Sequence, residues 1–217
     1  MTVAEFSMLE HVGLAAGWIA WCVLHSLLIT PSVTRRLRRR FGAQYAWFRF
    51  VYVVVSVLTL LPLLWWQWGI DTPLVWAWHL PWSLLQWTLL GGAGIIMYLG
   101  ARQYDQPFFF GIRQIRDHLS THDAEYAGFE VRGILARVRH PYYTAGILFL
   151  LAYGDVTASN LILKAVGIAY FIVGAFLEEK KLVAEFGEQY REYQRRVPMF
   201  IPRLRGDRDG RTQGSGS

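Results

Sequence analysis

Residues 47–68 read WFRFVYVVVSVLTLLPLLWWQW, and this stretch decides the fold class. It holds one charged side chain, that of Arg49, among 22 residues. A helix of that length crosses a hydrocarbon core of about 30 Å, whereas a soluble helix of that length would need a polar face. Two further apolar runs occupy residues 12–29 and 82–100. The sequence therefore predicts an all-α, polytopic integral membrane protein with three transmembrane helices in this part of the chain.

The last apolar region differs from these runs, because Gly154-Asp155 interrupts it. The part before the interruption, residues 142–153, would reach only ~18 Å as a helix, and the part after it covers residues 161–177. The first of these helices begins either beside Pro141 or earlier, near Arg132, with a kink at the proline. Both alternatives predict a C-terminal transmembrane helical hairpin with its tip at Gly154-Asp155.

The chain is expected to form one membrane domain over residues 1–202. The three helices fall within 12–102, and the hairpin, with a tail helix near 182–196, falls within 132–202. Residues 203–217 form a polar tail whose glycine- and serine-rich end is typical of a vector-derived sequence. Only 18% of the residues are charged, ten are tryptophan and one is cysteine, which excludes a disordered chain and a disulfide scaffold.

Basic residues are distributed asymmetrically along this pattern. Of 22 lysines and arginines, only Lys164 falls on the side opposite to the rest. The positive-inside rule then predicts a bacterial inner-membrane protein with its N-terminus in the periplasm and its C-terminus in the cytoplasm. The basic block at 35–40 could contact lipid headgroups or nucleic acid, and its place after a membrane helix favours anionic lipid and no nucleic acid. Six tryptophans form an expected aromatic belt at the outer interface: Trp65, Trp66, Trp68, Trp76, Trp78 and Trp82.

Two polar clusters flank the hairpin. They are Arg139-His140-Pro141-Tyr142-Tyr143-Thr144-Ala145-Gly146 and Glu178-Glu179-Lys180-Lys181. A hairpin brings its ends together, so His140 and Glu178 are expected to be neighbours. Carboxylates hold ammonium groups, arginine holds carboxylates, and aromatic faces hold cations or stack on purines, so the clusters suit a zwitterionic, partly aromatic ligand. The alternative is structural, with Arg139 as an interface anchor, the glutamates at a solvated helix end, and Pro141 as a helix-start proline capped by His140.

Three motifs resemble the C-terminal signature of the isoprenylcysteine carboxyl methyltransferase and phospholipid methyltransferase superfamily. They are Arg139-His140-Pro-x-Tyr143-x-x-Gly146, Leu177-Glu178-Glu179-Lys180-Lys181-Leu182 and Glu185-Phe186-Gly187-x-x-Tyr190-x-x-Tyr193. In the common pattern the glycine follows the tyrosine by two residues, and here it follows by three. Residues 21–40, with His25-Ser26-Leu27-Leu28, and the segment from Tyr104-Asp105 to Phe109-Phe110-Gly111 more weakly resemble the bacterial methanethiol S-methyltransferase- and nurim-like branch.

This resemblance implies S-adenosylmethionine (SAM) as the cofactor, bound by the hairpin at the cytoplasmic side. It implies His140, Tyr143 and one of the two glutamates as contacts. The full candidate cofactor site comprises Arg139, His140, Pro141, Tyr143, Gly146, Glu178 and Glu179. Methyl transfer from a sulfonium is an in-line displacement with a neutral leaving group, so the protein has to align the reactants and exclude water. No metal is needed.

Two residues outside the hairpin motifs are candidate catalytic groups. His25 lies deep in the first helix, where a histidine either contacts substrate and accepts its proton or makes an interhelical hydrogen bond. Asp105, just after the third helix, is either a general base or the N-cap of the next segment. His118 and His122 have the spacing of a zinc half-site on a helix, but the residues around them favour a loop.

The function expected from these observations is SAM-dependent methylation of a small or lipophilic acceptor. A thiol, a carboxylate and a lipid headgroup all remain open, with the N-terminal resemblance favouring a thiol. The alternative is a non-catalytic membrane scaffold or a haem-handling accessory protein, for which His25 is the deep histidine that an axial ligand would require. The sequence sets no oligomeric state.

Overall fold

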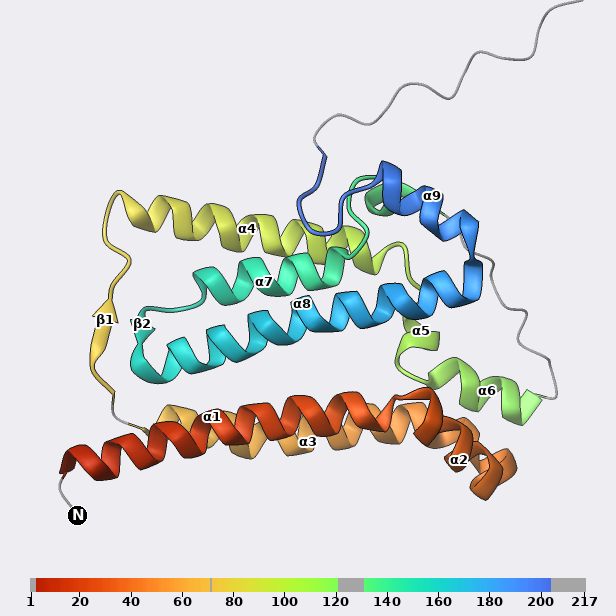
Figure 1. The fold of residues 1–217 in the computed structure, drawn as a ribbon, viewed down its shortest axis with the longest axis horizontal. Coiled ribbons are helices and arrows are strands. Elements are labelled where there is room, and N and C mark those ends of the chain that lie inside the picture. The colour runs from red at the N-terminus through yellow and green to blue at the C-terminus, as the bar shows by residue number, and fades with distance from the viewer. Residues whose placement is uncertain (1–2, 71, 121–130, 204–217) are drawn as a thin grey trace, which may run out of the picture.

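The computed structural model describes residues 3–70, 72–120 and 131–203, and helices make up most of this part of the chain (Figure 1). The long helices are α1 (Val3–Leu28), α3 (Phe48–Gly69), α4 (Trp82–Ala101) and α8 (Ala158–Phe186). The shorter elements are α2 (Pro31–Phe41), η1 (Gly42–Trp47), β1 (Leu74–Trp76), α5 (Gln106–Phe109), α6 (Ile112–Ser120), η2 (Gly133–Ala136), α7 (Pro141–Ala152), β2 (Val156–Thr157) and α9 (Glu188–Arg196).

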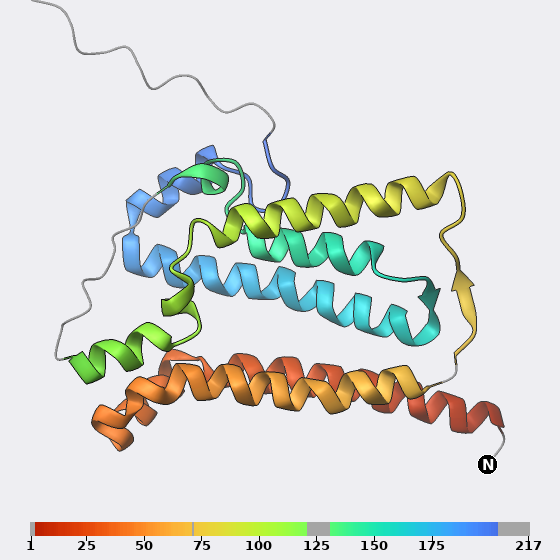
Figure 2. The same cartoon turned by 180° about the vertical axis from the view of Figure 1, so that it is seen from behind.

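The helices lie in two groups. Helices α4, α7 and α8 lie side by side, and α1 and α3 form a second pair that packs on α8 through α1 (Figures 1 and 2). The contact between the groups centres on Leu14 and Trp18 of α1, which are buried with Leu63 of α3 against apolar residues of α8. The Trp18 indole N–H donates to the Gln67 side-chain oxygen at 2.7 Å, so a polar group inside the bundle is satisfied.

Four helical stretches among the described residues are long and apolar enough to cross a membrane. They are Met8–Leu28, Pro31–Gly69, Trp82–Ala101 and Ala158–Phe186. Large apolar side chains cover their outer faces, among them Trp65, which is 78% exposed, and Trp87. An outward apolar surface of this kind suits lipid contact. The prediction of an all-α polytopic membrane protein is confirmed, with α8 as the full-length arm of the hairpin and α7, at 12 residues, as the short arm.

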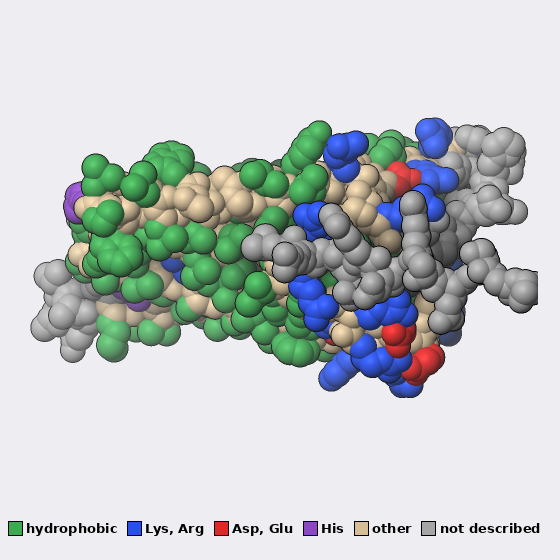
Figure 3. All heavy atoms as spheres, turned by 90° about the horizontal axis from the view of Figure 1, so that it is seen from above, with side chains coloured by type: hydrophobic (Ala, Val, Ile, Leu, Met, Phe, Trp, Pro, Cys, Tyr) green, Lys and Arg blue, Asp and Glu red, His purple; other side chains and the backbone are tan. Residues whose placement is uncertain are grey.

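Charge separates the two ends of the bundle. Lysine and arginine side chains gather at the end that holds α2, α6 and α9, as Figure 3 shows. At the other end, β1 pairs antiparallel with β2, a contact that the sequence did not predict. The Trp78 indole N–H donates to the Gly154 carbonyl at 2.9 Å, and its backbone N–H donates to Asp155 Oδ1 at 3.1 Å. The hairpin tip therefore lies at Gly154-Asp155, as predicted.

Two sequence-based expectations are settled at the basic end. Helix α7 begins at Pro141, and η2 is separate from it, so the alternative of one helix from Arg132 with a kink is wrong. The tail helix expected near residues 182–196 is wrong as one continuous helix. Helix α8 runs on to Phe186, Gly187 breaks it with a φ of 56°, and α9 follows. Glycine adopts this left-handed backbone region at little cost, and the break turns α9 back toward the start of α7.

Candidate functional site

The hairpin brings the two polar clusters together at the basic end. Pro141 occupies the first turn of α7, where its missing N–H costs no hydrogen bond. His140 precedes it in the capping position, but its side chain makes no cap hydrogen bond. The imidazole instead reaches α8, with Nε2 at 3.1 Å from Glu179 Oε1 and Nδ1 at 4.0 Å from Glu178 Oε2. The expected proximity of His140 and Glu178 is therefore present in the fold.

Glu179 is the centre of a buried polar clamp, formed with Arg139, Tyr190 and Gln194. Arg139 Nε donates to its Oε1 at 2.6 Å, and Gln194 Nε2 donates to its Oε2 at 2.6 Å. The Tyr190 hydroxyl adds a donor at 3.4 Å. Arg139 Nη1 donates to the carbonyls of Gln194 and Val197 at 2.9 and 2.5 Å. Buried charges are tolerated when they are paired and fully hydrogen-bonded, so the clamp joins α7, α8 and α9.

Glu178 is placed quite differently from its neighbour. Its side chain is 46% exposed, against 9% for Glu179. The Tyr143 ring stacks on the His140 ring, with centroids 5.5 Å apart and planes at 23°. Burial, and next the negative charge of Glu178, raise the pKa of Tyr104, which places this tyrosine within electrostatic reach of the carboxylate. We call Tyr104, His140, Tyr143 and Glu178 the mouth of the hairpin.

The segment after α9 also lies across the start of α7. We call residues 198–203 the strap. Arg139 and His140 donate their backbone N–H groups to the Pro198 and Met199 carbonyls at 3.0 and 3.2 Å. The Thr144 hydroxyl donates to the Phe200 carbonyl at 2.9 Å. Sequence analysis missed the strap, because the strap contributes only main-chain groups to these bonds, and such groups leave no side-chain signature.

Gly146 and Pro141 contribute to packing. A Cβ atom on Gly146 would lie 2.5 Å from Cε2 of Phe171 in α8, so this glycine allows α7 and α8 to approach. Pro141 is fully buried, and its Cβ would lie 3.5 Å from a Cβ added to Gly100 of α4. These contacts wedge α7 between its neighbours, and neither residue projects a polar group toward the mouth.

His25 lies in a second polar cluster, between α1, α3 and α8. Its Nδ1 lies 3.0 Å from Ser56 Oγ and its Nε2 lies 2.6 Å from the Tyr52 hydroxyl. The Trp21 ring stacks on the imidazole with centroids 4.8 Å apart. A hollow of about 10 Å³ beside His25 has room for roughly one water molecule. Both ring nitrogens already have partners, which leaves no axial position for haem.

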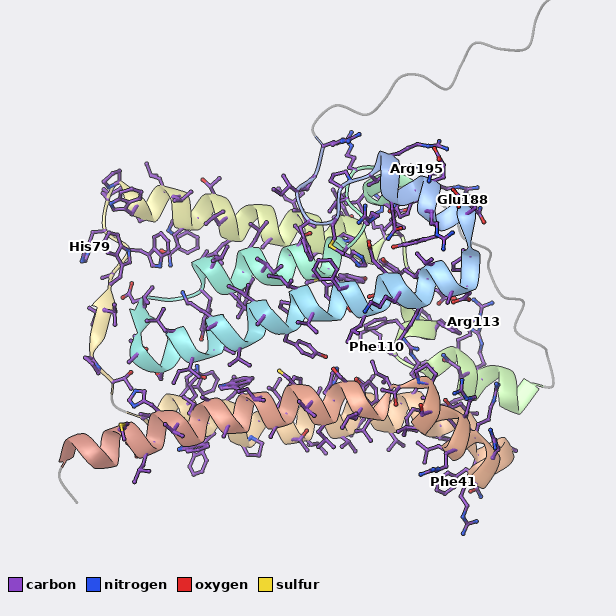
Figure 4. The ribbon with its side chains drawn as sticks, in the orientation of Figure 1. Phe41, His79, Phe110, Arg113, Glu188 and Arg195 are labelled. Carbon is purple, nitrogen blue, oxygen red and sulfur yellow. The ribbon has the colours of Figure 1, made fainter. Side chains whose placement is uncertain are left out.

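Asp105 is the N-cap of α5. Its Oδ1 accepts the Phe108 N–H at 3.1 Å, and its Oδ2 pairs with Arg113, which Figure 4 labels beside α6. These two interactions, the backbone bond first, lower the pKa of the Asp105 carboxyl. A carboxylate so held is a weak base. The placement therefore favours the capping role over the catalytic one.

The zinc half-site falls mostly outside the described residues. The backbone of His118 lies in α6, so that part is helix and not the loop that we expected. The His118 side chain and all of His122 lie outside the described part of the chain. Within that part, no group of three histidine, cysteine or acidic side chains is placed to hold a metal ion.

Comparison with known proteins finds relatives of one kind. The chain is 32% identical over 191 residues to methanethiol S-methyltransferase 2 of Bradyrhizobium diazoefficiens, covering 85% of this chain and 70% of the relative. It is 34% identical to methanethiol S-methyltransferase of a Pseudomonas strain, covering 72% and 64%. It is 29% identical to the Mycobacterium tuberculosis protein of the same name, covering 81% and 75%. No family model and no solved structure matches the sequence.

Proposed function

We propose that this chain, which belongs to the methanethiol S-methyltransferase family and is a membrane methyltransferase, transfers a methyl group from SAM to a small thiol at the cytoplasmic side of the membrane. The observation that carries this proposal is the mouth at the basic end of the hairpin. There a half-exposed carboxylate lies beside a histidine and stacked aromatic rings. The choice of a thiol as the methyl acceptor rests on the names of the relatives.

The chemistry of the mouth fits SAM in part. Glu178 offers a half-exposed carboxylate for an ammonium group. The rings of Tyr143 and Tyr104, which stack on His140 and Tyr142, add aromatic groups that can hold a sulfonium or a purine. Arg139 was the expected partner of the carboxylate group of SAM, but its donors point to Glu179 and to two main-chain carbonyls. We therefore assign His140, Tyr143 and Glu178 to the cofactor, and Arg139 and Glu179 to the clamp that holds them in place.

SAM supplies an electrophilic methyl group, and the residues of the hairpin align it and keep water out. The clamp and the strap fix His140 between Glu179 and the Met199 carbonyl. A group held in this way needs no reorganisation when substrate binds, which lowers the barrier to an in-line transfer. His25 is the proposed proton acceptor for the thiol. The scaffold and haem alternatives find no support, because the relatives are methyltransferases and His25 has no free ring nitrogen.

The acceptor class is tested directly with SAM that carries an isotopically labelled methyl group. The purified protein in lipid nanodiscs is given methanethiol, an isoprenylated cysteine carboxylate or phosphatidylethanolamine. We expect the label in dimethyl sulfide, with discs lacking added thiol as the control. Label in a methyl ester or in the lipid would assign another acceptor, and no transfer to any of the three would contradict the proposed activity.

We also propose that the basic end of the bundle faces the cytoplasm. In a Cys22→Ala background, Gln44→Cys lies in η1 at this end, and His79→Cys lies at the other end, where Figure 4 labels the histidine. We expect an impermeant thiol reagent to label His79→Cys in intact spheroplasts and Gln44→Cys only after the membrane is opened. The reverse order would overturn the orientation.

A further inference from the structure

The hydrogen bonds around His25 have a direction. Ser56 Oγ lies 2.7 Å from the carbonyl oxygen of Tyr52, one turn earlier in α3, and donates its single proton there. It therefore accepts a hydrogen bond from Nδ1 of His25, which places the ring proton on Nδ1. Nε2 is then an acceptor, and the Tyr52 hydroxyl donates to it at 2.6 Å. The shortest contacts thus define a neutral imidazole, whose Nε2 lone pair accepts a hydrogen bond from the Tyr52 hydroxyl.

The Tyr52 hydroxyl also has a second acceptor within reach. The same oxygen lies 3.3 Å from the backbone carbonyl of His25. If Nε2 took the tyrosine proton, its new N–H would donate back to the tyrosine oxygen. A proton arriving on that oxygen from outside would then donate to the His25 carbonyl. Every donor keeps a partner before and after such a shift, so it leaves no buried group unsatisfied.

One face of α8 connects this cluster to the mouth. Tyr170, Gly174 and Glu178 lie at intervals of four residues, roughly 6 Å per step along the helix. Tyr170 accepts a hydrogen bond from Ser26 at 3.3 Å, and its ring meets the His25 ring edge-on with centroids 6.3 Å apart. A Cβ atom on Gly174 would lie 3.7 Å from the Tyr143 hydroxyl. The Tyr143 side chain therefore lies against α8 at Gly174, between the mouth and His25.

Resting on the proposed function, we infer that Tyr52 and His25 form the proton relay of the methyl transfer and that Ser56 is its positioning residue. As the bond between the thiol sulfur and the methyl carbon forms, the bond from that carbon to the sulfonium would break and release a neutral thioether, and the S–H bond of the thiol breaks. The thiol proton passes to the Tyr52 oxygen, and the Tyr52 proton passes to Nε2 of His25. Tyr52 is the group that meets the thiol, because both nitrogens of His25 are covered.

The relay conserves charge inside the bundle. The positive charge that the sulfonium loses reappears on the imidazolium, so no new net charge is created in a region of low dielectric. The Trp21 ring, stacked on His25 with planes 16° apart, presents its π face to the cation. A carboxylate in the place of His25 would be neutralised by the same proton. The neutral histidine therefore suits a cationic methyl donor.

The decisive variant is Tyr52→Phe, which removes the hydroxyl and keeps the ring. Alkyl thiols ionise at or above the pKa of about 8.5 found for cysteine, so methanethiol is mostly protonated at neutral pH. We expect kcat with methanethiol to fall by about 100-fold or more, with SAM affinity unchanged by calorimetry. With 2,2,2-trifluoroethanethiol, which ionises more readily, we expect the loss to largely disappear. Tyr98→Phe, at a tyrosine of α4 that is 63% exposed, is the matched control.

The pH dependence separates a relay from a structural role. In Tyr52→Phe, turnover of methanethiol is expected to rise by about tenfold per pH unit below the thiol pKa, following the thiolate in solution. Ser56→Ala should lose turnover less severely and recover with the same acidic thiol. Equal losses of Tyr52→Phe with both thiols, or no loss with either, would overturn the relay. Failure of the unmodified protein with both thiols would instead remove the proposed function on which the relay rests.

Discussion

Glu178→Gln is expected to weaken SAM binding by roughly 10- to 150-fold and to leave the thermal stability of the protein nearly unchanged. The substitution removes the negative charge and keeps the shape of the side chain. A hydrogen bond to a charged group contributes about 1.5–3 kcal/mol, which corresponds to that loss of affinity. Stability should hold because the side chain is half exposed and lies outside the clamp. Titration calorimetry and thermal melting of the same preparation measure the two quantities.

Glu185→Gln is the matched control for this experiment. Glu185 lies about two turns beyond Glu178 in α8 and is exposed to solvent, so its substitution removes a charge from the same helix end. If Glu178→Gln bound SAM as tightly as Glu185→Gln, the half-exposed carboxylate would be an ordinary helix-end residue. The proposed cofactor site would then have lost its only contact for an ammonium group.

The substitution Glu179→Ala, one residue further along, is expected to act mainly on thermal stability and only indirectly on SAM affinity. It leaves the buried Arg139 guanidinium without its carboxylate partner and removes an acceptor from Tyr190 and Gln194. Breaking a buried ion pair from one side costs about 3–5 kcal/mol. We expect a large fall in the melting temperature and loss of SAM binding as a secondary consequence, because α9 loses the hydrogen bonds of Tyr190 and Gln194 to α8.

A double variant tests the assignment of the clamp. Replacing both charges, as Arg139→Met with Glu179→Leu, removes the unpaired cation, so the pair should be more stable than Glu179→Ala alone. Melting temperatures of the single variants Arg139→Met and Glu179→Leu and of the double variant give the coupling between the two residues. Independent, additive effects would contradict the clamp, and a stable Glu179→Ala protein with weakened SAM binding would return Glu179 to the cofactor.

The meeting of His140 with the glutamates could be predicted, because it follows from topology alone. Hydrophobic runs of membrane length fix the helices, and a hairpin must bring its two ends together. The same logic could not decide which glutamate faces inward. Glu178 and Glu179 are consecutive, so they point in directions about 100° apart on a helix. Only the positions of Arg139 and Gln194 determine that the second one is buried.

Other parts of the site lie beyond sequence patterns for a different reason. The strap is held largely by main-chain hydrogen bonds, and any sequence with free N–H groups could make them. The two roles weighed for Asp105 could not be separated without knowing that Arg113 reaches back to it across α5. In the sequence, Tyr52 and Ser56 are ordinary residues of an apolar run. Only the packing of α1 on α3 shows that they contact His25.

The strap also sets the order in which the mouth is made during protein synthesis. Thr144 leaves the ribosome long before Phe200, its partner 56 positions later in the sequence. Nascent chains fold from their N-terminal side, so the spanning helices are inserted while the main-chain groups at the start of α7 still await the strap. A translation product that stops between α8 and residue 198 would therefore enter the membrane with its mouth unfinished. Cellular quality control would have to recognise that product by its incomplete basic end and not by any failure of insertion.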